Sequence, residues 1–78
     1  KLSHTEKREL EGVMDLIEAA ELEVTSLQEK LADPALYQGA GDEVTTLRGE
    51  LEAAEAEALR LTERWEELEA RKAGAAGQ

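Results

Sequence analysis

The sequence predicts an all-α protein: a two-helix antiparallel coiled-coil hairpin with a short helical turn at its tip. Three observations predict it. Two long runs of apolar residues alternate spacings of three and four, and the segment between them contains one proline and two glycines. Residues three and four apart lie on one face of a helix, so each run is typical of a coiled-coil seam. The proline and the glycines interrupt the helix and let the chain reverse.

The first helix is expected over about residues 4–32. Its seam consists of Leu10, Val13, Ile17, Ala20, Val24, Leu27 and Leu31. Ser3 followed by Glu6 indicates a capping box, in which each side chain accepts a hydrogen bond from the other residue's backbone N–H. The helix is expected to end before Pro34, because the residue preceding a proline is biased away from helical geometry.

The connection between the helices is expected to occupy residues 33–42. Asp33 as N-cap and Pro34 as first helical residue predict one short helical turn there. Leu36 and Tyr37 follow in this turn. We expect them to fold back over the seam and close the tip, and the alternative is that they stay exposed and bind a partner.

The second helix is expected over about residues 43–72, with Asp42 as its N-cap. Its seam consists of Val44, Leu47, Leu51, Ala54, Ala58, Leu61, Trp65 and Leu68. Gly74 is expected to stop the helix, which leaves residues 73–78 as a disordered tail. Residues 1–72 then form one domain, the most that a chain of this length supports.

Antiparallel pairing requires that the residue numbers of facing layers add to a nearly constant value. The two runs meet this condition throughout: Leu10 faces Trp65, and Val24 faces Leu51. The same register opposes charged residues in three pairs, Lys7 with Glu69, Glu9 with Arg64 and Lys30 with Glu43. Because one chain satisfies its own seam, we expect a monomer.

Charge is distributed unevenly along this chain of net charge −10. Residues 1–13 and 60–78 together carry seven basic and seven acidic residues, whereas residues 14–59 carry two basic and twelve acidic ones. The end of the hairpin that carries the termini, called the base below, is therefore neutral, and the body and tip are acidic. Only the base offers cations to a polyanion. The candidate nucleic-acid-binding residues are Lys1, Lys7, Arg8, Arg60, Arg64, Arg71 and Lys72.

No set of catalytic or metal-binding residues stands out. His4 is the only histidine and there is no cysteine, so neither a thiolate zinc site nor a disulfide can form. Ser3 is better explained as a helix cap than as a nucleophile, and no glycine-rich phosphate loop is present. No stretch has the length and apolarity of a membrane span. We therefore expect a domain without catalysis, cofactor, metal or membrane insertion.

Three stretches of the chain carry a resemblance to a known family. Residues 1–11 read KLSHTEKRELE, residues 31–37 read LADPALY and residues 64–69 read RWEELE. With these stretches the chain resembles the C-terminal coiled-coil domain of ABC-F family ATP-binding cassette ATPases, and within that family the Uup-like proteins. The resemblance implies a cytoplasmic protein with two tandem ATP-binding cassettes in the same polypeptide, which acts on ribosomes or nucleic acid. It also implies that this domain binds nucleic acid while the cassettes hydrolyse ATP.

Two positions depart from the pattern of that family. His4-Thr5 stand where the family often has Tyr-Lys, which removes an aromatic ring and a positive charge. Val13-Met14 stand where the family often has Leu-Pro, which removes the expected proline kink and should leave the first helix straighter.

The sequence thus predicts a non-catalytic interaction domain that contacts DNA or ribosomal RNA through the base of the hairpin. Trp65 could stack on unpaired bases, but its place in the seam favours burial. The alternative function is a structural coiled-coil module that binds another protein, with no nucleic-acid role. Such a partner would contact the acidic surface or the seam-flanking residues Met14, Leu16 and Leu22.

Overall fold

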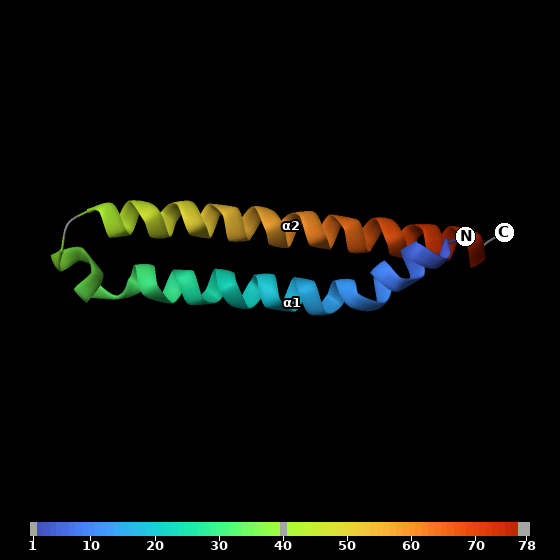
Figure 1. Ribbon diagram of the computed structural model, residues 1–78, viewed down its shortest axis with the longest axis horizontal. Helices are drawn as coiled ribbons and strands as arrows, with labels where there is room; N and C mark the ends of the chain where they lie inside the picture. The colour runs from blue at the N-terminus through green and yellow to red at the C-terminus, as the bar shows by residue number, and fades with distance from the viewer. Residues whose placement is uncertain (1, 40, 77–78) are drawn as a thin grey trace.

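The computed structural model describes residues 2–39 and 41–76, which form two long antiparallel helices joined by a short 3₁₀ helix (Figure 1). Helix α1 spans His4–Ala32, the 3₁₀ helix η1 spans Pro34–Gln38, and helix α2 spans Asp42–Ala76. The molecule measures 60 × 18 × 15 Å. The predicted all-α hairpin with a helical turn at its tip is confirmed.

The N-terminus of α1 has the predicted capping box. The backbone N–H of Glu6 donates to Ser3 Oγ at 3.1 Å, and the backbone N–H of Ser3 donates to Glu6 Oε1 at 3.0 Å. Two donors that a helix start leaves without intrahelical partners are thereby satisfied.

Helix α1 is bent even though it contains no proline. Figure 1 shows its first turns, drawn in blue, inclined toward the end of α2. Gly12 lies in this part of the helix, and a glycine lacks the side chain that would restrict the backbone. Because of this inclination the N-terminal segment stays close to the end of α2. Leu2 is buried there, although the sequence did not place it in the core.

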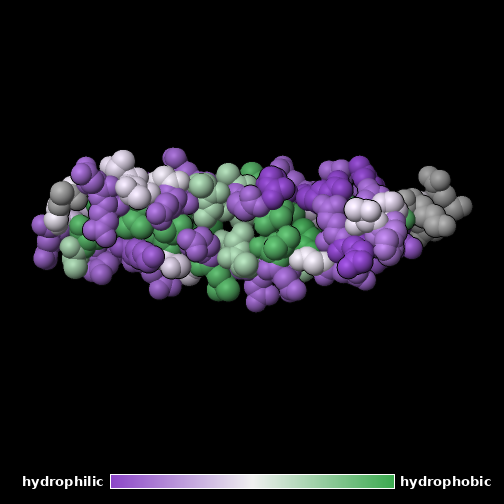
Figure 2. All heavy atoms as spheres, in the orientation of Figure 1, coloured by the Kyte–Doolittle hydropathy of each residue, from purple (hydrophilic) through white to green (hydrophobic). Residues whose placement is uncertain are grey.

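The predicted seam forms the core of the molecule. Every predicted seam residue of both helices is buried or half-buried. Val13, Leu27 and Leu68 are the most completely buried, with at most 1% of their surface exposed. The predicted register is confirmed where Val13, Ile17 and Leu61 form one cluster with Leu10, Ala20 and Trp65 packed against it. On the face shown in Figure 2, apolar residues lie over the tip half and the middle of the molecule, bordered by polar residues, and the end near the termini is mainly polar.

The tip has the predicted cap but only part of the predicted packing. Asp33 Oδ1 accepts a hydrogen bond from the Ala35 backbone N–H at 3.0 Å, which starts η1. Leu36 is half-buried, as expected of a residue that closes the tip. Tyr37 donates its hydroxyl hydrogen to the Leu31 carbonyl, yet 53% of its surface is exposed. The hydroxyl anchors Tyr37 to the end of α1, and the ring does not enter the core.

Helix α2 starts one residue earlier than the sequence predicts. Asp42 is its first helical residue and not its N-cap. The backbone N–H of Thr45 donates to the Gly41 carbonyl at 3.1 Å, and Thr45 Oγ1 donates to the same oxygen at 3.2 Å. Gly41 therefore precedes the helix, and Asp42 lies in the first turn, where a carboxylate interacts favourably with the helix dipole.

Helix α2 also continues beyond its predicted end. It runs to Ala76, so residues 73–76, predicted as part of a disordered tail, are helical, and residues 77–78 lie outside the described part. The reason is local propensity. Gly74 costs only about 1 kcal/mol in a helix interior, and the alanines around it are the strongest helix formers.

We predict that Leu27→Ala destabilises the hairpin far more than Leu22→Ala, five residues away on α1. Leu27 is 1% exposed, and removing its side chain opens a cavity that costs about 2–4 kcal/mol. Leu22 is 64% exposed, so its truncation should change the free energy of unfolding by no more than about 0.5 kcal/mol. Urea unfolding followed by circular dichroism measures both. Equal losses would mean that the seam is misplaced.

Candidate nucleic-acid interface

Six of the seven basic residues predicted to contact nucleic acid lie in the described part of the chain. Antiparallel pairing brings the start of α1 alongside the end of α2, and so gathers these residues at the base from both helices. They are Lys7 and Arg8 on α1, and Arg60, Arg64, Arg71 and Lys72 on α2. Lys1 lies outside the described residues.

Arg64 is held by carboxylates of both helices. Its Nε donates to Glu9 Oε2 at 2.7 Å and its Nη2 donates to Glu9 Oε1 at 2.8 Å, which confirms the predicted pair across the seam. Its Nη1 donates to Glu67 Oε1 at 2.8 Å. Hydrogen bonding by Arg64 lowers the pKa of Glu9, and the same bonds raise the pKa of Arg64. All three guanidinium nitrogens of Arg64 are therefore occupied.

Arg71 and Arg60 are also paired with carboxylates. Arg71 Nη2 donates to Glu67 Oε1 at 2.9 Å, and Arg71 Nη1 pairs with Glu6 of α1. The pKa of Glu6 is lowered, first by the hydrogen bond from the Ser3 backbone N–H and then by Arg71. Arg60 pairs with Glu57 one turn earlier on α2, and this bond lowers the pKa of Glu57.

The other three basic residues at the base make no ion pair within the described residues. Lys7, Arg8 and Lys72 are exposed. The register placed Lys7 opposite Glu69, and the two side chains do line the same groove without forming an ion pair. The structure thus divides the predicted binding residues into two arginines that link the helices, Arg64 and Arg71, one arginine paired within α2, Arg60, and three exposed cations without an ion pair in the described residues.

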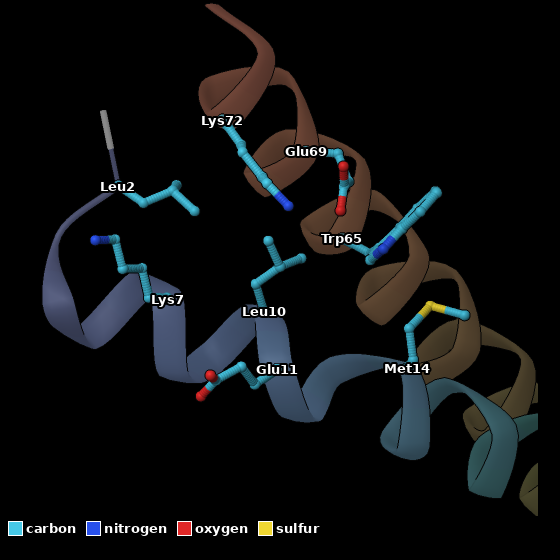
Figure 3. A pocket seen from close by; sticks show the side chains of 8 residues that line it. All are labelled: Leu2, Lys7, Leu10, Glu11, Met14, Trp65, Glu69 and Lys72. Atoms are coloured by element: carbon cyan, nitrogen blue, oxygen red, sulfur yellow. The ribbon is translucent and has the colours of Figure 1, made fainter. Parts of the chain in front are cut away.

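A groove that the sequence analysis missed lies between the helices at the base (Figure 3), with a volume of about 560 Å³. Its apolar wall consists of Leu2, Leu10, Met14 and Trp65, and its charged residues are Lys7, Glu11, Glu69 and Lys72. Trp65 is half-buried: it packs against the core cluster and also lines the groove. The burial predicted for Trp65 is therefore only partial. In the sequence, only the position of Trp65 near the end of the seam could have indicated this groove.

The described residues, 2–39 and 41–76, contain no group of three histidine, cysteine, aspartate or glutamate residues arranged to hold a metal ion. Within the same residues, neither long helix has the sustained apolarity needed to cross a membrane.

Comparison with known proteins finds a family and several relatives. The family described as ABC transporter C-terminal domain matches residues 1–70. Over 72 residues the chain is 44% identical to two proteins of Haemophilus influenzae, "ATP-binding protein Uup-like" and "ATP-binding protein Uup". Over 74 residues it is 36% identical to "ATP-binding protein Uup" of Escherichia coli K12.

These alignments cover 92–95% of this chain but only 11–16% of the length of the three relatives. The similarity therefore concerns one small region of much longer proteins. No solved structure matches the chain.

We predict that Glu9→Gln lowers the free energy of unfolding at neutral pH, because Arg64 loses its bidentate carboxylate partner. The pKa of Glu9 is lower in the folded state. Its contribution is therefore present above the unfolded value, about 4.3 for a glutamate, and is lost as the pH falls through the lower folded value. The difference between the wild-type chain and the variant should shrink below about pH 4.

Urea unfolding at several pH values measures this difference. Glu18→Gln is the matched control, because Glu18 is an exposed carboxylate of α1 with no ion pair in the described residues. It should not destabilise the chain at neutral pH. A Glu9→Gln difference that is independent of pH would contradict the assigned role of the ion pair.

Proposed function

Because this chain belongs to the ABC transporter C-terminal domain family, we propose that it is the C-terminal interaction domain of a Uup-like ATPase. In this proposal the domain does no chemistry itself. It contacts DNA or ribosomal RNA through the base of the hairpin, in the cytoplasm, while tandem ATP-binding cassettes elsewhere in the same polypeptide hydrolyse ATP.

One observation carries the nucleic-acid proposal: three exposed cations that make no ion pair in the described residues lie at the only end of the molecule that is not acidic. Lys7, Arg8 and Lys72 are exposed at the base. Residues 14–59, which form the body and tip, hold twelve acidic residues against two basic ones. A phosphate backbone is repelled along most of the hairpin and meets available cations at the base.

The paired arginines have a different role in this proposal. Arg64 and Arg71 link α2 to carboxylates of α1, so a phosphate that bound them would first have to displace Glu9 or Glu6. We therefore narrow the contact residues to Lys7, Arg8 and Lys72. Arg64 and Arg71 keep the two helix ends together and so hold these three cations at the same end of the molecule.

A protein partner is the second candidate, and the exposed apolar residues favour it. Leu16, Leu22 and Leu59 each expose more than half of their surface, 56%, 64% and 59% respectively. A partner helix could cover such residues by apolar contact. Binding of this kind depends weakly on salt, whereas phosphate binding weakens steeply as salt rises.

We predict that the pair Arg8→Gln and Lys72→Gln, one change on each helix, weakens nucleic-acid binding and flattens its salt dependence. Each lost phosphate contact should reduce the slope of log affinity against log salt concentration by about one. Fluorescence anisotropy with a labelled DNA and a labelled RNA, titrated over a range of salt, measures both quantities.

The matched control is the pair Lys30→Gln and Arg48→Gln, which also removes one cation from each helix but near the tip. It should leave the salt slope unchanged. If both pairs weaken binding equally, only the net charge matters and the base is not the contact surface. If neither DNA nor RNA binds even at low salt, the nucleic-acid proposal fails and the protein partner is favoured.

A further inference from the structure

The groove at the base has a lining that phosphate contact alone does not require. An aromatic side chain and three aliphatic ones form its wall, and one lysine from each helix borders it. From this combination we infer that the groove binds an unpaired base of single-stranded nucleic acid, stacked against Trp65, with the flanking phosphates on Lys7 and Lys72. This inference rests on the proposed function and names the class of nucleic acid.

Trp65 is suited to stacking because it is already held in place. Part of the side chain packs against the cluster of Val13, Ile17 and Leu61, and another part borders the groove. Ordering a free side chain would cost conformational entropy when the base binds, and a side chain packed in the seam avoids most of that cost. The groove volume, about 560 Å³, lies within the range of small-molecule sites.

The charged residues indicate which part of a nucleotide enters. Glu11 and Glu69 line the groove and disfavour a phosphate inside it, whereas carboxylates accept hydrogen bonds from the amino groups of bases. Lys7 and Lys72 make no ion pair in the described residues, and Figure 3 shows the Lys72 side chain extending from α2 toward α1. The unpaired nucleobase therefore lies inside the groove, and the flanking phosphates lie at its rim.

This arrangement selects single strands over duplexes. In a duplex the faces of the bases are covered by stacking within the helix, so Trp65 can reach a base only where the strand is unpaired. Single-stranded DNA and an RNA loop share this chemistry, because every base has a face that can stack. The two are separate arms of the experiment.

The fluorescence of Trp65 tests the inference directly, because Trp65 is the only tryptophan of the chain. Short unlabelled single-stranded DNA, single-stranded RNA and a duplex of the same sequence are titrated into the wild-type protein at low salt. We expect at least one of the two single strands to quench Trp65, and the duplex to leave its emission unchanged. No variant is required, so a folding defect cannot hide the result.

Substitutions test the same inference through affinity. Trp65→Leu keeps an apolar residue in the seam but removes the stacking face, and should weaken single-strand binding about tenfold, the loss expected for one stacked base. Trp65→Phe should retain most of the affinity. Arg8→Gln, a matched control outside the groove, should weaken single strands and duplex alike and leave the quenching at saturation unchanged.

Three results would overturn the inference. If single strands and duplex bind equally and Trp65 emission does not change, the groove is not the site, although the proposed phosphate contact stands. If no nucleic acid binds, the proposed function itself fails. If Trp65 emission shifts to the blue as protein concentration rises, with a doubled mass in light scattering, a second copy of the chain covers the groove.

Discussion

The fold depends on a single narrow layer of apolar side chains between two helices. Each helix can bury only the stripe that faces its partner, so the core is one seam with no second layer behind it. Seven apolar side chains are buried in the described residues, and they are spread along the whole hairpin. Because the core contains so few side chains, the register of the seam determines which surface residues of the two helices meet. The electrostatics at the base of the hairpin follow from that register.

At the base, where the net charge is zero, the register determines which charged residues form ion pairs and which do not. Glu6 and Glu9 of α1 lie within reach of Arg71 and Arg64 of α2, so these carboxylates and guanidinium groups neutralise one another across the seam. These bonds are only partly covered from solvent, and each contributes modestly to stability. Their larger consequence is positional, because Lys7, Arg8 and Lys72 remain as exposed cations of the base that make no ion pair in the described residues.

The end of the seam is where an interior surface becomes accessible. Near the base, Trp65 is only half-buried, although Leu68, three residues further along α2, has 0% of its surface exposed. Leu2 is buried there, and the groove opens beside it. One tryptophan therefore packs in the core and also presents an apolar wall to the groove, and function is proposed for the place where burial is incomplete.

The sequence by itself determined the helices, their pairing and the caps at Ser3 and Asp33, because these follow from short-range spacing and local hydrogen bonds. It also indicated that the base of the hairpin has no net charge, since counting its charged residues needs only the sequence and the antiparallel order of the two helices. Only the tertiary structure decided that α1 bends, that Leu2 is buried and that the groove exists. Likewise, the pair of Arg71 with Glu6 emerged only there. These features depend on where long side chains reach across two helices, a distance that residue spacing along one helix does not set.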